Sequence, residues 1–226
     1  MKSLNVIARL ECDFPTKFGL PRQSGLNAGL RGKIVFEPEY RRPDAVRGLE
    51  AFSHVWLIWE FEVPEREGWA ATVRPPRLGG NERVGVFATR SPFRPNPLGL
   101  TVAKLERVEI DAERGPILHI SGADMKDGTA IFDIKPYIPY ADSRPDAVGG
   151  FAERAKDYSL NVVCPEECLS EIPEEKREAL LGALSGDPRP AYQNDPERIY
   201  GFLYAGYNVR FSVDGDTLTV KEVRKC

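Results

Sequence analysis

The sequence lacks the motifs that several large enzyme classes require. It contains no phosphate-binding loop of the Gly-x-x-x-x-Gly-Lys-Ser/Thr type, and no Gly-x-Gly-x-x-Gly follows a predicted strand. Kinases, ATPases and dinucleotide enzymes built on a doubly wound sheet are therefore disfavoured. A nucleoside cofactor, if the protein uses one, has to bind on the loops of a β scaffold.

Long hydrophobic runs are also missing. No apolar run approaches the roughly 18 residues that cross a bilayer, and the first residues lack the apolar core of a secretory signal. We therefore expect a cytoplasmic protein without a membrane partner. With 42% hydrophobic and 29% charged residues over 226 positions, the chain can form one substantial core with a small appendage, or two modest domains.

Cysteine and histidine are both scarce. Of four cysteines only Cys164 and Cys168 are close in sequence, and the two histidines, His54 and His119, stand far apart. This is not the spacing of a structural zinc site, and neither histidine belongs to a recognisable Cys/His catalytic signature. We therefore predict no metal site and expect reduced, mostly structural thiols.

Charge is nearly balanced over the whole chain but not along it. The formal net charge is −3, yet between Arg74 and Arg94 there are five arginines and a single acid, Glu82. From Cys164 to Tyr200, nine acids face four bases. A local basic surface on a weakly acidic protein is compatible with selective RNA binding, but not with general coating of nucleic acid.

The most informative segment is 85–100, with the sequence GVFATRSPFRPNPLGL. Three prolines within six positions fix φ and remove backbone donors, so this loop holds Arg90, Arg94 and Asn96 in set directions. Two fixed guanidiniums and an amide suit a carboxylate, a phosphate or the edge of a nucleobase. The simpler interpretation is a proline-stiffened connector with two solvated arginines.

Most of the remaining pattern predicts β structure. Apolar stretches bounded by turn residues predict strands at 4–10, 32–36, 52–61, 83–89, 100–110, 117–122 and 130–134. Because little room is left between them for long helices, these strands favour an antiparallel or mixed barrel over alternating βαβ units. A long polar loop, 11–31, separates the first two strands, and loops of this length are commonly functional.

A second, smaller domain is expected after a linker rich in Asp, Pro and Gly at 141–150. Residues 173–184 predict a helix that begins at a proline and has a glycine near its end. Further strands are predicted at 200–204, 207–213 and 217–223. The predicted fold class is therefore mainly β, with a β-barrel domain over 1–142 and a small α+β C-terminal domain over 143–226.

Four shorter patterns carry polar chemistry, and each has a simpler structural interpretation. The Pro-Arg-Gln run at 21–23 offers a cation and an amide, or is a surface turn. His54 lies in an aromatic strand, where a hydrogen-bonded core histidine is the favoured interpretation. Asp-Gly-Thr at 127–129 is typical of a turn. The segment 133–142 crowds two carboxylates, one ammonium and two phenols together, which can shift pKa values or stack a base.

Taken together and in order, several segments resemble the TsaA-like family. They are 17–23 (KFGLPRQ), 48–56 (GLEAFSHVW), 73–80 (VRPPRLGG), the proline-rich run and 133–137 (DIKPY). The resemblance spans roughly residues 4–142, and DPRPAY at 187–192 is similar to the C-terminal domain of bacterial members. Characterised members of the family are S-adenosylmethionine-dependent tRNA methyltransferases that methylate N6 of threonylcarbamoyladenosine, the modified base next to the anticodon.

The resemblance implies a β-barrel methyltransferase that acts on tRNA as a homodimer, with S-adenosylmethionine bound near the subunit interface. Carried over position by position, the cofactor contacts are Pro21, Arg22, Gln23, Phe61, Glu62, Arg90, Leu100, Asp127, Gly128, Thr129 and Ala130. Two of these depart from the commoner pattern of the family. Glu62 stands where histidine is frequent, and Ala130 stands where proline is frequent.

Contacts with the RNA are expected from a further set of polar side chains. The predicted substrate-binding residues are Arg74, Arg77, Arg94, Asn96, Lys135, Arg189 and Tyr192. The N6 nitrogen must also lose a proton when it is methylated. Asp133, Tyr137 and Asp142 are the predicted proton acceptors or relays.

Two other functions fit the same sequence. A non-catalytic RNA-binding adaptor of the same fold would keep the basic loop and the aromatic residues without the cofactor. A methyltransferase for a different small-molecule or protein acceptor is the second alternative, because fold and cofactor do not determine the acceptor.

Overall fold

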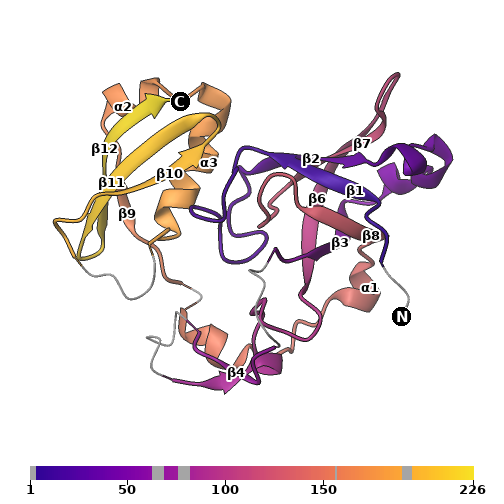
Figure 1. Ribbon diagram of the computed structural model, residues 1–226, viewed down its shortest axis with the longest axis horizontal. Helices are drawn as coiled ribbons and strands as arrows, with labels where there is room; N and C mark the ends of the chain where they lie inside the picture. Colours follow the sequence, from indigo (N-terminus) through magenta and orange to yellow (C-terminus); the bar gives the residue numbers. More distant parts are fainter. Residues whose placement is uncertain (1–3, 63–68, 76–81, 156, 190–194) are drawn as a thin grey trace.

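The computed structural model consists of a six-stranded barrel beside a four-stranded sheet that carries two helices (Figure 1). The structure describes residues 4–62, 69–75, 82–155, 157–189 and 195–226. The predicted fold class, mainly β with a barrel and a smaller α+β C-terminal part, is confirmed.

The barrel is closed, with the strand order β1-β2-β7-β6-β3-β8 and antiparallel pairing between all neighbours. Its strands are β1 (Ala8–Cys12), β2 (Arg31–Phe36), β3 (His54–Glu60), β6 (Leu98–Asp111), β7 (Gly115–Ser121) and β8 (Ala130–Pro136). Short 3-10 turns at Pro38–Tyr40, Pro43–Val46 and Leu49–Ala51 connect β2 to β3. The barrel is closed by β1 and β8, which pair at only two positions, Ala8↔Ile131 and Arg9↔Ala130.

Alternation along the strands fills the barrel with apolar side chains. On β3, Val55 and Leu57 are fully buried and Trp59 is nearly so, whereas Trp56 between them is half-buried on the outer face. Trp59 lies directly against Gly99 of β6, where an added Cβ would come within 2.1 Å of the indole ring. A glycine is therefore required at position 99 for the two strands to pack around this ring.

The predicted strand over 83–89 is wrong in most of its length. Only β5 (Val84–Gly85) is extended there, and it pairs with β4 (Thr72–Val73) outside the barrel. The next residues, Val86–Ala88, form a 3-10 turn. The backbone N–H of Thr89 and its hydroxyl both donate to the carbonyl oxygen of the first residue in this turn, at 3.1 and 2.8 Å. These bonds favour the turn over a β ladder.

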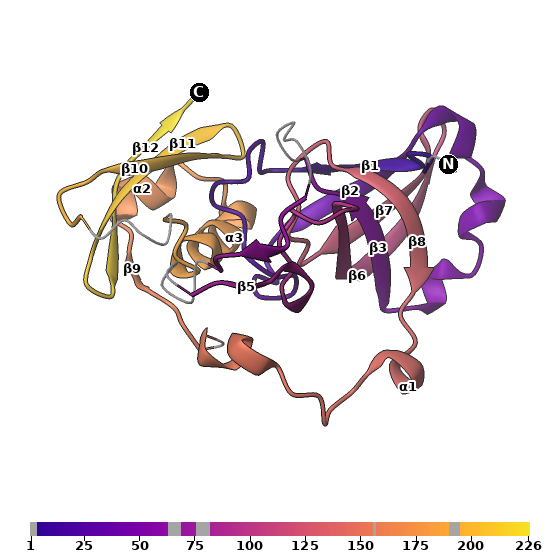
Figure 2. The same cartoon turned by 60° about the horizontal axis from the view of Figure 1, so that its bottom comes forward.

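The C-terminal sheet has the strand order β10-β11-β12-β9. Its elements are β9 (Asn161–Val163), α2 (Glu166–Ser170), α3 (Glu174–Ser185), β10 (Tyr200–Tyr204), β11 (Tyr207–Asp214) and β12 (Thr217–Lys225). The three longer strands and α3 were predicted, but α2 and the short β9, which pairs parallel to β12, were not. Between barrel and sheet lie a short helix, α1 (Pro139–Asp142), and a 3-10 segment, Gly150–Ala155, along one side of the molecule (Figure 2).

The loop between β1 and β2 joins the two parts of the molecule. It was predicted as a polar loop, yet its Phe14 and Leu30 are buried within the C-terminal core. The ring of Phe14 lies 5.0 Å from that of Tyr204 and 6.2 Å from that of Phe202, between ring centroids. The barrel core, by contrast, is built from residues between Ile7 and Ile134.

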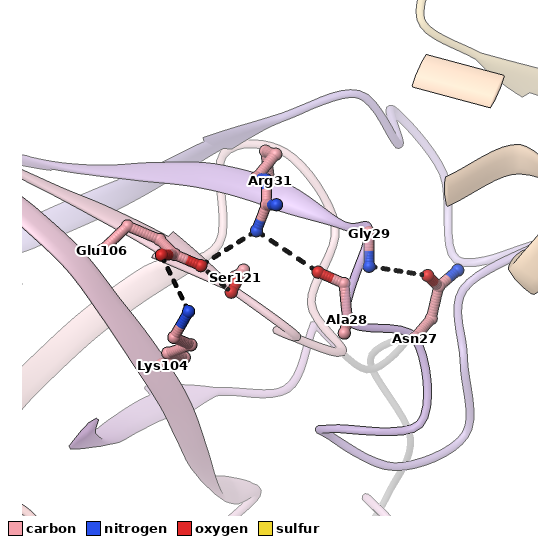
Figure 3. Close-up of polar contacts among 7 residues, drawn as sticks. All are labelled: Asn27, Ala28, Gly29, Arg31, Lys104, Glu106 and Ser121. Atoms are coloured by element: carbon pink, nitrogen blue, oxygen red, sulfur yellow. Dashed lines mark hydrogen bonds and ion pairs between the residues drawn. The ribbon is translucent and has the colours of Figure 1, made fainter. Parts of the chain in front are cut away.

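Asn27 fixes this loop to α3. It is buried, and its Nδ2 donates to the carbonyl oxygen of Ala179 at 2.8 Å. Its Oδ1 accepts the N–H of Gly29 at 3.2 Å (Figure 3). The backbone approaches the helix so closely that a Cβ at position 29 would lie 2.9 Å from the backbone nitrogen of Ala179. The loop therefore packs directly on the helix.

Where the loop enters β2, Arg31 joins it to the barrel wall. Nη1 of Arg31 contacts the carbonyl oxygen of Ala28 at 3.3 Å and Oε1 of Glu106 at 2.9 Å (Figure 3). Glu106 also accepts the hydroxyl of Ser121 and the ammonium of Lys104, and these hydrogen bonds lower the pKa of its carboxyl. The end of the loop is thus held on the barrel by a charged network.

Candidate functional site

A cavity of about 930 Å³ opens where the β1–β2 loop, the ends of β3 and β6, the proline-rich loop and the turn before β8 meet. Its lining includes the predicted cofactor positions Pro21, Arg22, Gln23, Phe61, Glu62, Arg90, Leu100, Gly128, Thr129 and Ala130. Segments far apart in the sequence are thus brought around one space. The volume lies within the range of small-molecule sites.

Asp127 is the predicted cofactor position that does not line the cavity. Its Oδ1 accepts the backbone N–H of Cys12 at 2.9 Å, and its own N–H donates to the carbonyl oxygen of Phe14 at 2.8 Å. The next residue, Gly128, has φ +74 and donates to the carbonyl oxygen of Leu10. Asp127 thus holds the turn against the end of β1, and the backbone of that turn faces the cavity.

Arg90 connects the two loops that border the cavity. Its Nη1 donates to Oε1 of Gln23, so two predicted cofactor residues from distant segments contact each other. Arg94 instead turns back into its own loop, where Nη1 donates to the carbonyl oxygens of Thr89 at 2.7 Å and Val86 at 3.3 Å. One arginine therefore spans the site, and the other fixes the shape of the loop.

Positive charge predominates around the cavity. The cationic side chains in its lining are Arg9, Lys17, Arg22, Arg90, Arg94 and Lys126, and the acidic ones are Glu60, Glu62 and Asp124. Lys126 forms an ion pair of 2.7 Å with Glu62, which lowers the pKa of that carboxyl, and Lys17 donates to the backbone carbonyl of Glu62. Such a lining suits a ligand that carries a carboxylate or phosphate.

Asp124 is a cavity residue that sequence reasoning missed. Its Oδ1 accepts the hydroxyl of Thr101 at 2.7 Å, and the oxygen of that buried threonine accepts Nε1–H of Trp59 at 2.9 Å. Burial raises the pKa of Asp124, although Thr101 and the nearby Arg90 oppose the shift. A partly buried carboxylate with a perturbed pKa in a cavity is a candidate functional group. Its position just after a predicted strand was the available signal.

The predicted proton acceptors are not among the lining residues of the cavity, although two of them contact one of those residues. Trp56, which does line the cavity, donates Nε1–H to Oδ2 of Asp142 at 3.0 Å, and its ring lies 5.9 Å from that of Tyr137. Hydrogen bonds from the backbone of Ile138 and from Trp56 lower the pKa of Asp142. Asp133 forms an ion pair of 2.8 Å with Lys135.

His54 corrects the prediction of a core histidine. Its neighbour Val55 faces the barrel interior, so alternation along β3 places the imidazole on the outer face. The ring is half-buried, with Nδ1 2.9 Å from the hydroxyl of Ser53 and an edge contact to Tyr137. The hydrogen bond was expected, but the location in the core is wrong.

The predicted substrate-binding residues do not form one surface. Arg74 and Asn96 are exposed, and Lys135 is held by Asp133. Arg77 and Tyr192 lie outside the described residues. Arg189 is buried and forms an ion pair with Asp187.

The pair of Asp187 and Arg189 links the C-terminal part to the cavity. The carboxylate accepts Nε–H of Arg189 at 2.9 Å and Nη2–H at 3.0 Å, and it also accepts the hydroxyl of Tyr158 at 2.7 Å. Nη2 of Arg22 donates to the backbone carbonyls of Arg189 and Asp187, at 3.3 and 3.5 Å. A cavity residue of the β1–β2 loop is therefore held by the C-terminal part.

Within the ranges that the structure describes, no group of three or more His, Cys, Asp and Glu side chains could hold a metal ion. The helices in those ranges are too short or too polar to cross a membrane. The four cysteines are free thiols, and burial raises the pKa of Cys12 to about 12.

The chain is similar to known proteins over its whole length. The family model for the tRNA-methyltransferase O N-terminal domain matches residues 9–143, and the model for the TrmO C-terminal domain matches residues 158–226. The tRNA (adenine(37)-N6)-methyltransferase of Escherichia coli K12 is 41% identical over 215 residues, 92% of this chain and 91% of that protein. The protein of the same name from Eikenella corrodens is 44% identical over 174 residues, 76% and 97% of the two chains. A crystal structure of TrmO from Pseudomonas aeruginosa has a TM-score of 0.80 and 32% identity, with 100% and 98% of the two chains covered.

Proposed function

Because this chain belongs to the tRNA-methyltransferase O family, we propose that it transfers a methyl group from S-adenosylmethionine to N6 of adenosine 37 in tRNA, next to the anticodon. The threonylcarbamoyl form of this adenosine is the proposed acceptor. The observation that carries the proposal is the cavity, which brings the predicted cofactor positions together from separate segments.

The cavity lining fits the cofactor chemically. S-adenosylmethionine supplies an electrophilic methyl group on a positively charged sulfur, and it also carries a carboxylate, an amine and an adenine. Arg90 suits the carboxylate, and its contact with Gln23 fixes its direction. The rings of Trp59 and Phe61, 4.3 Å apart, and the side chain of Leu100 suit the sulfonium and the adenine. The backbone of the turn at Gly128 suits the edge of the adenine.

The protein contributes mainly by positioning. Methyl transfer is an in-line displacement, so the N6 nitrogen must be held about 3 Å from the methyl carbon, and this alignment supplies much of the rate. The nitrogen must also lose its proton. We keep Asp133, Tyr137 and Asp142 as proposed acceptors, and we add Asp124 because it lines the cavity and is oriented by Thr101.

We further propose that the protein acts as a homodimer in the cytoplasm, with the cavity near the subunit interface. On the outer face of β3 and β6, Leu98 and Leu100 are exposed beside the half-buried Trp56 and Val102, and all four also line the cavity. A second copy on this apolar face would shield the site from water. Sedimentation of the protein, with and without a charged substitution at Leu100, tests the dimer.

The two proposed domains are 1–142 and 143–226, and we propose that the second contacts the tRNA. The boundary falls at the end of α1, in the segment that connects barrel and sheet. Support for a role near the RNA comes from Arg22, which joins the cavity to the C-terminal part.

Calorimetry on Arg90→Ala tests the cofactor site. We expect the affinity for S-adenosylmethionine to fall at least about tenfold, because the variant loses the cation assigned to the carboxylate. Arg107→Ala is the matched control, since Arg107 is an exposed arginine that pairs with Glu109 on β6 and does not line the cavity. Unchanged affinity in Arg90→Ala would reject the assignment.

Modified nucleosides in tRNA distinguish the proposed function from its alternatives. Cells that lack the gene should lose N6-methylated threonylcarbamoyladenosine and regain it with the wild-type gene. An adaptor would bind RNA without binding S-adenosylmethionine, which a thermal shift with the cofactor detects. A methyltransferase for another acceptor would bind the cofactor but leave the tRNA nucleosides unchanged.

A further inference from the structure

Two exposed aromatic rings lie next to each other outside the barrel. Trp69 is 50% exposed and Phe87 is 70% exposed, and their rings are stacked with centroids 5.9 Å apart and planes 26° apart. We call this pair the aromatic platform. Exposed stacked aromatic rings of this size are uncommon on a soluble protein unless a ligand or partner covers them.

The platform is held rigidly. The N–H of Ala70, next to Trp69, donates to the carbonyl oxygen of Phe93, and the N–H of Val86, next to Phe87, donates to the carbonyl oxygen of Ala71. The pairing of β4 with β5 joins the same two chain segments. Both rings therefore stand on backbone that is already fixed, so little conformational entropy is lost when a ligand stacks on them.

The platform adjoins the cofactor cavity. Thr89, Arg90 and Arg94 line the cavity, and they lie on the chain segment that continues from Phe87. The guanidinium carbon of Arg94 lies 5.7 Å from the centre of the Phe87 ring, so a residue of the cavity wall contacts the platform.

Charge around the platform favours an anionic partner. Arg74 and Arg83 are exposed on the segments that carry β4 and β5, and Nη1 of Arg83 donates to the hydroxyl of Thr72 at 3.0 Å. Among the described residues from Trp69 to Arg94, the single acid is Glu82, although the protein as a whole has a net charge of −3. Flat aromatic faces beside arginines fit an unpaired nucleobase and its phosphate better than an apolar protein surface.

We propose that the aromatic platform stacks an unpaired base of the anticodon loop that neighbours the methylated adenosine, with Arg74 and Arg83 near the adjoining phosphates. The identity of the RNA rests on the proposed function. The methylated base must leave the stack of the loop to reach the cavity, which deprives the next base of a stacking partner. The platform replaces the lost contact and thereby holds the loop at the cavity entrance.

Binding of an anticodon stem–loop RNA that contains threonylcarbamoyladenosine tests the platform in the presence of S-adenosylhomocysteine. By fluorescence anisotropy, Trp69→Ala and Phe87→Ala should each weaken RNA binding by roughly 5- to 150-fold, the range measured for lost base stacking. Trp69→Phe should keep most of the affinity because it keeps an aromatic face. Phe52→Ala is the control, since Phe52 is an exposed aromatic residue before the opposite end of β3.

Abasic substitutions in the RNA identify the stacked base. At one loop position, removing the base should weaken binding to the wild-type protein but not to Phe87→Ala, because the same contact is already lost. A uniform effect of every abasic site on both proteins would overturn the proposal. Arg74→Ala with Arg83→Ala should flatten the dependence of binding on salt.

Two other results would overturn the proposal. One is an unchanged RNA affinity in both Trp69→Ala and Phe87→Ala. The other is a change in the oligomeric state of these variants in sedimentation, which would make the platform a contact between copies of this chain. Methylation of the RNA by the wild-type protein is measured separately. If the wild-type protein leaves the RNA unmethylated, the proposed function fails, whereas the affinities of the variants still decide on the platform.

Discussion

The barrel and the C-terminal part obtain their cores in different ways. The barrel core is made from residues between Ile7 and Ile134, on its own strands and the turns between them. The C-terminal core takes Phe14 and Leu30 from the loop between two barrel strands. The barrel is therefore structurally autonomous, whereas the C-terminal part and that loop depend on each other.

The shared loop also lines the proposed cofactor cavity. The segment 20–24 of the loop lines the cavity, while Phe14 on the same loop is buried on the C-terminal side. An ion pair between Lys176 of α3 and Asp13 adds to the contact. The C-terminal part thus supports one wall of the cavity, in addition to any contact that it makes with RNA.

Phe14→Ala should disrupt the contact between the β1–β2 loop and the C-terminal core, and it should have the largest effect on stability. Truncation of a fully buried phenylalanine costs about 3–5 kcal/mol of unfolding free energy. The three tryptophans, Trp56, Trp59 and Trp69, all belong to the N-terminal part. In urea, we therefore expect the circular dichroism signal of the C-terminal part to be lost before the tryptophan fluorescence changes, and the affinity for S-adenosylmethionine to fall.

Leu57→Ala is the matched barrel variant for this experiment. Leu57 is fully buried in the barrel, so its truncation should cost about 2–5 kcal/mol and shift the tryptophan transition itself. If Phe14→Ala shifted both signals together and by the same amount, the two parts would unfold as one unit and the comparison would be wrong.

Arg189→Met distinguishes a structural role of Arg189 in the C-terminal part from a direct contact with RNA. The variant leaves the Asp187 carboxylate without its ion-pair partner at a site where both side chains are about nine-tenths buried. We expect a loss of about 2–3 kcal/mol from the C-terminal transition. Because the guanidinium faces Asp187, the salt dependence of tRNA binding should keep its wild-type slope.

A reduced salt slope for Arg189→Met, without loss of stability, would instead place Arg189 on the RNA, as the sequence suggested. Arg198→Met is a control for this experiment. Its guanidinium lies over the ring of Tyr200, the first residue of β10. It has no ion-pair partner among the described residues.

Asp124→Asn tests the barrel side of the cavity and should have the smallest effect on stability. Burial raises the pKa of Asp124 above the ordinary value of an aspartate, so the folded protein binds this proton more tightly than the unfolded chain does. Stability is therefore lost as pH rises through the raised pKa. The amide removes this cost, so the variant should be more stable than the wild type at neutral pH, and the difference should vanish as pH falls to the unfolded value.

Urea denaturation of both proteins at several pH values, followed by tryptophan fluorescence, measures this difference. The rate of methylation gives a second result, because a proton acceptor cannot be replaced by an amide without loss of turnover. Full turnover in Asp124→Asn would exclude Asp124 as the acceptor and leave a purely structural carboxyl.

Much of the fold was predictable because its signals are local. The apolar pattern of β3, the helix after Pro173 and the hairpin of β11 and β12 are each encoded in consecutive residues. The predicted cofactor positions came from the resemblance to the family. All of them except Asp127 line one cavity, because they lie at the ends of barrel strands and in the adjoining loops.

The features that were missed depend on contacts between distant residues. Asp124 stands out because it is hydrogen-bonded to Thr101 of β6, which in turn is hydrogen-bonded to Trp59 of β3. Arg189 resembled an exposed RNA contact because nothing in its sequence pattern shows that Asp187, in a left-handed conformation with φ 53, folds back onto it. The turn at Val86–Ala88 is likewise held by Arg94, eight residues beyond its first residue.

The pairing of β1 with β8 has a further consequence for how the molecule responds to its ligand. Two residue pairs make this junction, and Arg9 and Ala130, which form one of them, also face the cavity. A ligand that contacts both strands would stabilise the barrel where it has the fewest backbone pairs. We therefore expect a bound ligand to disfavour local opening of this junction.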